Sequence, residues 1–233
     1  MKTSSLMLGA TAVALAAWGI LGSGVAAEKA VPLPPPAQDL RVTAPTDTAV
    51  FAGGCFWGVQ AVFQHTRGVL NAVSGYAGGD QASANYNAVS MGTSGHAESV
   101  QVTFDPRQVT YGQLLQVYFS VAHDPTTVNR QGPDAGPQYR SALFYRDADQ
   151  KRVAESYIAQ LDAAKVFPSK IVTQVVPLKG FYPAEAYHQD YATRHPDSPY
   201  IATFDLPKVA NLQTTLPQFY RDKPVLVSAQ GKG

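Results

Sequence analysis

The sequence predicts an α+β fold in which amphipathic helices cover a mixed, mainly antiparallel sheet. Short strand-like segments are interspersed irregularly with helical ones. Few of these strands are the long, continuously apolar runs that a doubly wound parallel sheet needs. A chain of 233 residues, 45% hydrophobic and 15% charged, is long enough for one well-buried core and too short for two large ones. We therefore expect one main domain.

The N-terminus has the pattern of a secretory signal. Lys2 precedes an apolar stretch from Leu6 to Leu21, and small residues follow, ending in Val25-Ala26-Ala27. This order predicts a signal peptide over residues 1–27 that is cleaved on export, with the periplasm as the expected location. An uncleaved N-terminal membrane anchor is the alternative, because the apolar stretch approaches the length that spans a bilayer.

Residues 28–47 are rich in proline, which fixes φ and removes backbone donors, so we predict a semi-rigid linker there. The main domain and its tail then occupy residues 48–222, and residues 223–233 are expected to form a flexible C-terminus. The formal net charge is +1, and it falls to 0 if Lys2 leaves with the signal. A near-neutral chain without a Lys/Arg run gives no electrostatic reason to bind nucleic acid.

The strands and helices are predicted from periodicity and from the glycines and prolines between them. Residues 98–104 alternate, with Val100, Val102 and Phe104 on one face, which predicts a half-buried strand. Residues 111–122 carry apolar side chains at helical spacing. Similar patterns predict strands at residues 49–52, 68–75, 139–145 and 171–176, helices at 56–65, 148–165 and 185–194, and loops at 75–79 and 124–138.

Cys55 is the single cysteine of the chain, and it stands at a predicted helix start after Gly53 and Gly54. Without a second cysteine it cannot form an intramolecular disulfide, so it is either a reactive thiol or a buried one. The positive end of a helix and its unpaired N–H groups lower the pKa of a thiol there. The glycines let other groups approach the sulfur, and Phe56 and Trp57 place large apolar side chains beside it. This setting favours a catalytic cysteine over a structural one.

Glu98 falls on the apolar face of the strand at residues 98–104. A carboxylate there is desolvated, which raises its pKa toward neutrality and makes it a proton donor. The alternative is that Glu98 lies at the edge of the strand and reaches solvent, and His96 could be its partner. The five histidines have no metal-ligand spacing, and a single cysteine excludes the common zinc clusters, so we expect no metal.

A series of short motifs follows in order between residues 50 and 194. They are Gly53-Gly54-Cys55-Phe56-Trp57-Gly58, Gly75-Tyr76-Ala77-Gly78-Gly79, Tyr86 with Val89, Gly95-His96-Ala97-Glu98, His123-Asp124-Pro125-Thr126, Arg130-Gln131-Gly132 with Asp134, Gly136-Pro137-Gln138-Tyr139-Arg140-Ser141, and Tyr187-His188-Gln189. Together they resemble the A-type methionine sulfoxide reductases, a family that reduces methionine S-sulfoxide, free or in proteins. So many ordered motifs argue strongly against chance similarity.

The resemblance implies a ferredoxin-like α/β sandwich with a curled sheet, and protein repair after oxidative damage as the function. It implies that Cys55 is the nucleophile, which is left as a sulfenic acid, and that Glu98 is the acid. The other implied catalytic residues are Tyr86 and Tyr139, whose hydroxyls would donate to the sulfoxide oxygen, and Asp134, which would act through water. Phe56 and Trp57, next to Gly54, would form the pocket for the S-methyl group.

Many members of the family carry one or two further cysteines near the C-terminus that attack the sulfenic acid, and this chain has none. An external thiol, such as a thioredoxin-like protein, must then attack Cys55 directly, and no bound cofactor is implied. We expect a monomer whose partners are oxidised proteins or peptides and this reductant.

Three other functions fit part of the pattern. A thiol peroxidase also cycles through a sulfenic acid, although the paired aromatic residues and Glu98 argue against it. A Cys–His hydrolase would use His96, His123 or His188 as its base. A secreted binding module could hold methionine sulfoxide or an apolar peptide without turnover.

Overall fold

The computed structural model describes residues 28–227, so the predicted signal peptide and the last residues of the predicted flexible C-terminus lie outside the described chain. The predicted α+β fold is confirmed. Its centre is a six-stranded sheet with the strand order β7-β6-β1-β3-β2-β8. The strands are β1 (Asp47–Gly53), β2 (Val69–Ala77), β3 (Ala97–Phe104), β6 (Ser141–Tyr145), β7 (Gln174–Pro177) and β8 (Phe181–Pro183).

The sheet is mainly antiparallel, because only the pairing of β6 with β7 is parallel among its described strands. A separate small ribbon pairs β4 (Arg130–Gln131) with β5 (Asp134–Ala135). The register places Tyr76 of β2 opposite Glu98 of β3. Alternation along β3 follows the predicted pattern, and Val100, Val102 and Phe104 are fully buried.

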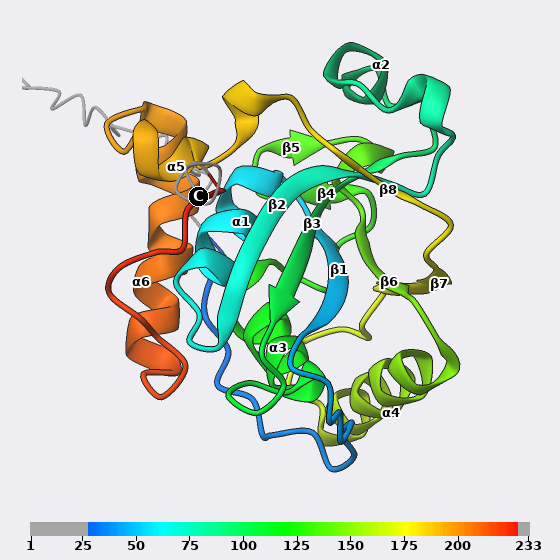
Figure 1. Ribbon diagram of the computed structural model, residues 1–233, viewed down its shortest axis with the longest axis vertical. Helices are drawn as coiled ribbons and strands as arrows, with labels where there is room; N and C mark the ends of the chain where they lie inside the picture. Colours follow the sequence, from blue (N-terminus) through cyan, green and yellow to red (C-terminus); the bar gives the residue numbers. More distant parts are fainter. Residues whose placement is uncertain (1–27, 228–233) are drawn as a thin grey trace, which may run out of the picture.

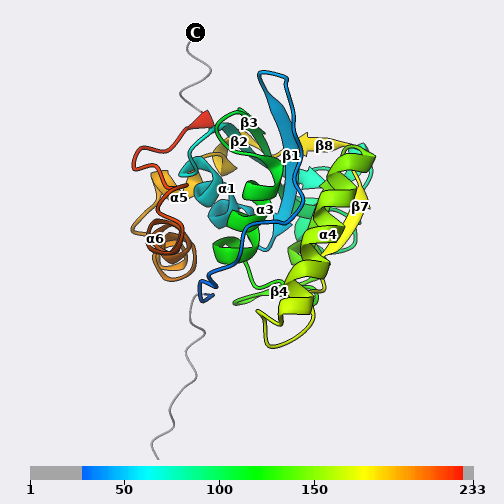
Figure 2. The same ribbon diagram turned by 90° about the horizontal axis from the view of Figure 1, so that it is seen from below.

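The main helices lie against the sheet and against each other. Helix α1 (Phe56–Gln64) packs on β2 and β3, and α4 (Ala148–Ala164) packs on β6 and β7. Helix α3 (Tyr111–Val117) continues into a π-helical turn, η2 (Tyr118–Ala122). Figures 1 and 2 both show α6 (Leu206–Thr215) lying beside α1, so the C-terminal part of the chain returns to its N-terminal part. No helix within residues 28–227 is both long and apolar enough to cross a membrane.

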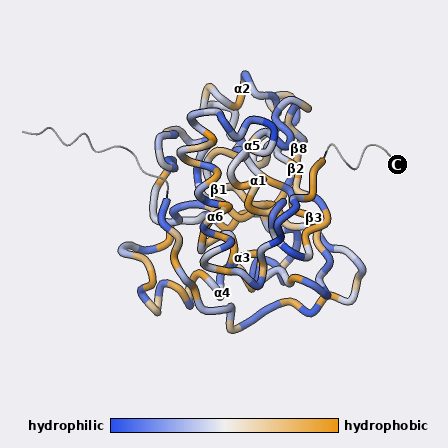
Figure 3. Tube along the Cα trace, turned by 90° about the vertical axis from the view of Figure 1, so that its left-hand side faces the viewer, coloured by the Kyte–Doolittle hydropathy of each residue, from blue (hydrophilic) through white to orange (hydrophobic). Residues whose placement is uncertain are grey.

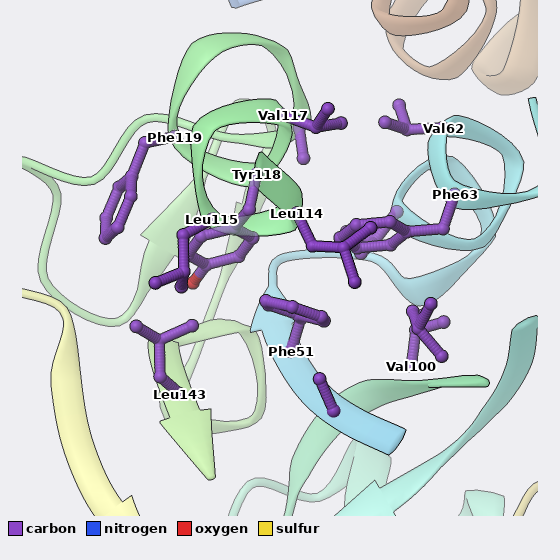
Figure 4. Close-up of a cluster of buried hydrophobic side chains, with 14 of the residues drawn as sticks. Phe51, Val62, Phe63, Val100, Leu114, Leu115, Val117, Tyr118, Phe119 and Leu143 are labelled. Atoms are coloured by element: carbon purple, nitrogen blue, oxygen red, sulfur yellow. The ribbon is translucent and has the colours of Figure 1, made fainter. Parts of the chain in front are cut away.

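One large hydrophobic core joins the sheet to these helices. Figure 4 shows its centre, where Phe51 of β1 lies near Phe63 of α1 and Leu114 of α3. The Phe51 and Phe63 rings stack with their centroids 4.7 Å apart. A smaller cluster that includes Val50 and Phe144 lies on the other face of the sheet. In Figure 3 the hydrophobic stretches gather around β1 and α1 in the middle of the molecule.

Most predicted elements are present, but several boundaries differ. The predicted helix at residues 185–194 is broken into η4 (Ala186–His188) and α5 (Tyr191–Arg194), because Asp190 has a positive φ of 57°. The Gln189 side chain holds this break by bonding to both backbone groups of Ser74. The strand predicted to begin at Tyr139 begins at Ser141, and Tyr139 is the last residue of the 3₁₀ helix η3 (Pro137–Tyr139). Strand β2 also continues through Tyr76 and Ala77, where a loop was predicted.

Several short elements were not predicted at all. They are strand β8, strands β4 and β5 within the predicted loop at residues 124–138, the 3₁₀ helix η1 (Gln81–Ser83), α2 (Tyr86–Ser90), the π-helical turn η5 (Ile201–Asp205) and helix α6. Strand β7 begins at Gln174 rather than at the predicted residue 171.

The proline-rich segment predicted to be a linker packs against the domain. Leu33 is buried, and the Val31 N–H donates to the Ser120 carbonyl at 2.9 Å. The Tyr157 hydroxyl of α4 donates to the Pro34 carbonyl at 2.7 Å. Asp39 accepts a hydrogen bond from the Gly112 N–H at the start of α3. The prolines thus fix a path over the helix surface, and the first part of this segment does not behave as a spacer.

Candidate active site

Cys55 occupies the N-cap position of α1, as the sequence predicted. Gly54 precedes it with a φ of +88°, a conformation that only glycine adopts easily. A Cβ at Gly54 would also lie 2.6 Å from the Gln131 Cβ, so the site leaves no room for a larger residue. The local sequence therefore turns the chain sharply from β1 into α1 and places the thiol at the helix start.

Glu98 lies at this same helix start and is buried, with an exposed fraction of 3%. Its Oε2 accepts a hydrogen bond of 3.0 Å from the Phe56 backbone N–H. Burial raises the pKa of Glu98 to about 8, whereas the Phe56 N–H acts to lower it. The alternative prediction that Glu98 reaches solvent is therefore wrong. At neutral pH the carboxyl of Glu98 is mostly protonated. His96 bonds to the Gly79 N–H and the Asp80 carbonyl instead.

The electrostatics of Cys55 differ from the expectation of a depressed pKa. Burial raises the pKa of the thiol well above its ordinary value, and the nearby carboxylates of Asp205 and Glu98 raise it further. The Trp57 backbone N–H, at the start of α1, acts in the opposite direction. Desolvation thus outweighs the helix terminus, and the resting thiol is neutral.

Tyr86, Tyr139 and Asp134 lie in the same cluster. The hydroxyls of Tyr86 and Tyr139 have raised pKa values, first because of desolvation and then because of the negative charges of Glu98, Asp134 and Cys55. Burial also raises the pKa of Asp134, whose Oδ2 accepts a hydrogen bond from the Tyr200 hydroxyl. The fold therefore brings together all five predicted catalytic residues, which come from α1, β3, α2, η3 and β5.

Aromatic rings form one side of the site. Phe56 is buried, and its ring centroid lies 5.1 Å from that of His188. Trp57 stacks on Tyr191 at 3.9 Å and donates its indole N–H to His188 Nδ1 at 3.2 Å. Tyr86 lies 4.6 Å from the His188 ring. The predicted Phe56 and Trp57 pair is thus part of a larger aromatic wall.

Three residues of the site were not predicted to take part in sulfoxide reduction. His188 was considered only as the base of the rival Cys–His hydrolase, and Tyr200 and Asp205 come from the tail, where no pattern marked them. Asp205 is fully buried, and burial raises its pKa to about 7. These residues reach the site only because η4 and η5 fold back onto α1, which no local sequence signal predicts.

Glu98 makes the stability of the protein depend on pH. Its folded pKa of about 8 lies above the ordinary value of 4.5 for a glutamate, so between these two pH values the folded state holds a proton that the unfolded state has released. The contribution of the protonated Glu98 to the stability of the folded state is complete below about pH 4.5, and it is lost as the pH rises through about 8. Glu98→Gln should therefore gain stability relative to the unmodified protein across this window, by about 4 to 5 kcal/mol at pH 8.5.

Denaturant unfolding of both proteins from pH 4.5 to 8.5 measures this difference. The variant must be compared with the unmodified protein because His123 and His188 have lowered pKa values, which make the stability of the protein rise with pH instead of fall. A constant difference across the window would contradict the burial of a neutral carboxyl at position 98.

The contacts of the histidines bear on the rival functions. His123 Nε2 lies 2.8 Å from the Ser141 hydroxyl, deep in the core, and His188 accepts from Trp57. Neither these two nor His96 contacts Cys55 through any hydrogen bond within residues 28–227, so a Cys–His dyad is not present in that part of the chain. In the same range, no group of three or more His, Cys, Asp or Glu side chains could hold a metal ion.

A sequence model of the family described as "Peptide methionine sulfoxide reductase" matches residues 47–218. The chain belongs to this family. The protein named "Peptide methionine sulfoxide reductase MsrA 2" from Mesorhizobium japonicum is 59% identical over 190 residues, which cover 82% of this chain and 97% of that protein. The "Peptide methionine sulfoxide reductase MsrA" of Thermus thermophilus is 50% identical over 165 residues, covering 71% of this chain and 92% of that protein.

Solved structures agree with the assignment to the A-type peptide methionine sulfoxide reductases. Mxr1 from Saccharomyces cerevisiae in reduced form has a TM-score of 0.60 and 32% identity, covering 72% of this chain and 95% of that one. Methionine sulfoxide reductase A of Corynebacterium diphtheriae has a TM-score of 0.57 and 34% identity, covering 72% of this chain and 85% of that one.

Proposed function

We propose that this peptide methionine sulfoxide reductase reduces the S epimer of methionine sulfoxide, free or in oxidised proteins, through Cys55 and Glu98. The observation that carries the proposal is the pairing of a buried thiol with a buried, protonated carboxyl at one helix start, where the Phe56 N–H binds Glu98 at 3.0 Å. A sulfoxide oxygen is a poor leaving group until it is protonated, so the reaction needs an acid that is neutral at working pH. Glu98 supplies that acid.

In the first step the Cys55 sulfur attacks the sulfoxide sulfur while Glu98 protonates the oxygen. The hydroxyls of Tyr86 and Tyr139 donate to this oxygen as negative charge develops on it, and Asp134 assists through water. The oxygen then passes to Cys55, methionine leaves, and the sulfur of Cys55 has been oxidised by two electrons to a sulfenic acid. The hydroxyl of the sulfenic acid consists of the sulfoxide oxygen and the proton from Glu98, and the proton that the Cys55 thiol loses passes to Glu98, so the carboxyl is protonated again.

Recycling requires a reductant from outside the chain. Cys55 is the single cysteine, so no thiol of the same molecule can attack the sulfenic acid. An external thiol, such as that of a thioredoxin-like protein, forms a mixed disulfide with Cys55 and releases water, and a further thiol then frees Cys55. This cycle needs no prosthetic cofactor and is compatible with a monomer.

Export to the periplasm completes the proposal. It is supported by Lys2, the apolar stretch and the small residues that end at Ala27. The mass of the protein recovered from the periplasmic fraction tests it, because cleavage removes residues 1–27. Recovery of the full-length chain from the membrane fraction would favour the anchor instead.

The aromatic wall predicts a strong preference between substrate epimers. Phe56 and Trp57 would hold the S-methyl group while Glu98 and the tyrosines fix the oxygen, and a site that fixes both groups accepts one chirality. We expect reduction of dabsyl-methionine S-sulfoxide and no detectable reduction of the R epimer in a chromatographic assay with dithiothreitol. Equal rates on the two epimers would overturn the assignment of the pocket.

A further inference from the structure

Asp205 is a buried acidic residue whose carboxyl group has no hydrogen-bonding partner among the described residues 28–227. It ends η5, it is fully buried, and neither of its oxygens accepts a hydrogen bond from any residue in the range 28–227. Such a group is costly to bury, because a carboxylate that leaves water loses its hydration without replacement. A residue of this kind calls for an explanation other than packing.

The position of Asp205 relates it to Cys55. Its Oδ1 lies directly over Gly58, where a Cβ on the glycine would overlap it. Gly58 stands in the first turn of α1, the turn that Cys55 caps. The absence of a side chain at position 58 thus lets a carboxylate approach the helix start that carries the nucleophile.

An ion pair between a buried lysine and a partly buried glutamate interacts with Asp205. Lys208 of α6 is 3% exposed, and its Nζ lies 3.4 Å from Glu28 Oε2. The Glu28 backbone is itself held by the Asn211 side chain, which donates to its carbonyl at 3.2 Å. Burial acts to lower the pKa of Lys208, whereas the negative charges of Glu28 and then of Asp205 raise it, so Lys208 is shared between the two carboxylates.

We propose that Asp205 is a positioning residue that keeps the Cys55 thiol protonated in the resting enzyme, and that Lys208 limits the strength of this effect. A negative charge near a thiol opposes its ionisation, and a positive charge favours it. In agreement, Asp205 is the largest contributor after burial to the raised pKa of Cys55, and the negative charge of Cys55 acts on Lys208.

The consequence concerns which oxidants react with Cys55, and it rests on the proposed function. A thiolate attacks hydrogen peroxide, forming a sulfenic acid on the cysteine and releasing hydroxide, whereas a neutral thiol reacts slowly. The sulfenic acid can attack a second molecule of peroxide, which gives a sulfinic acid and water, and thiols do not reduce a sulfinic acid. A protonated resting thiol would therefore spare the single cysteine from peroxide, while a sulfoxide bound next to Glu98 still reacts.

The test is the pH dependence of Cys55 alkylation by iodoacetamide in the full chain. Asp205→Asn should lower the midpoint by about one pH unit or more and speed alkylation at pH 7 by about ten-fold. Lys208→Met should move the midpoint in the opposite direction. Asp197→Asn, the same change at an exposed position of the same tail, is the matched control and should leave the midpoint unchanged.

Other charged and titratable groups also face Cys55, so the variants are repeated in a Glu98→Gln background. These groups are Glu98 of β3, Asp134 of β5, Tyr86 of α2, Tyr139 of η3, Tyr200 of η5, Lys208 of α6 and Glu28, which pairs with Lys208. If Lys208→Met does not fold because Glu28 is left unpaired, the Glu28→Gln/Lys208→Met double variant replaces it. Asp205→Ala must shift the midpoint in the same direction as Asp205→Asn.

A midpoint that stays in place or rises in Asp205→Asn would overturn the proposal. A merely structural role predicts slower alkylation or lower activity at every pH with no movement of the midpoint, and this result would overturn it too. Alkylation requires no sulfoxide, so the inference can fail while the proposed function stands. A lower midpoint in a protein that does not reduce methionine sulfoxide would instead refute the function alone.

Discussion

Glu98→Ala should slow sulfoxide reduction by about 100- to 10,000-fold, the loss expected for a positioned general acid. The carboxyl is buried beside Cys55, and its pKa of about 8 keeps it protonated at neutral pH. Alanine removes the proton donor and also leaves the Phe56 N–H without its acceptor. Glu98→Gln should be milder, because its amide can still donate a hydrogen bond to the sulfoxide oxygen and accept one from Phe56.

Single-turnover kinetics with methionine S-sulfoxide measure this effect without interference from recycling. Glu155→Gln, on the exposed side of α4, is the control and should retain the full rate. The rate with Glu98 intact should fall as pH rises through about 8, because the proton is then lost from the acid. An unchanged rate in Glu98→Ala would remove Glu98 from the mechanism and leave Tyr86 and Tyr139 as the donors.

Without a reductant, the enzyme should release at most about one methionine per chain and then stop. The reason is the cysteine count: after methionine leaves, Cys55 is a sulfenic acid, and the chain has no second thiol to resolve it. Burial of Cys55 also limits disulfide formation between two chains. Addition of a small thiol or a thioredoxin-like protein should restore turnover.

Counting methionine by chromatography over a range of enzyme concentrations gives the stoichiometry, and dimedone labelling with mass spectrometry locates the sulfenic acid. Cys55→Ser is the control and should release no methionine and take no label. Several methionines per chain without thiol, or a label elsewhere than Cys55, would show that the proposed cycle is wrong.

The part of the site that the sequence predicts is the part encoded locally. Cys55 follows two glycines at a helix start, and Glu98 interrupts an apolar strand face, so both stand out within a few residues of context. Local sequence did not predict that the pKa of Cys55 is raised and not lowered. The direction depends on burial by distant segments and on the carboxylate of Asp205, which outweigh the helix terminus.

The same distinction holds for the fold. Strand β3 and helix α4 carry clear periodicity and appear close to their predicted bounds. The break between η4 and α5 is set by Gln189, whose side chain binds the backbone of β2, and such a tertiary contact overrides local helix preference. Tyr86 and Tyr139 were placed by resemblance, and their convergence depends on short helices that periodicity cannot detect.

Because the C-terminal segment folds back onto α1, the residues that surround Cys55 are synthesised at very different times. Cys55 and Glu98 are made early, whereas His188, Tyr200 and Asp205 are among the last parts of the chain. A growing or truncated chain that ends before η4 therefore carries Cys55 but lacks His188, Tyr200 and Asp205. The protection that we propose for Asp205 is therefore acquired only when synthesis is nearly complete, and until then the newly made chain carries its one thiol without it.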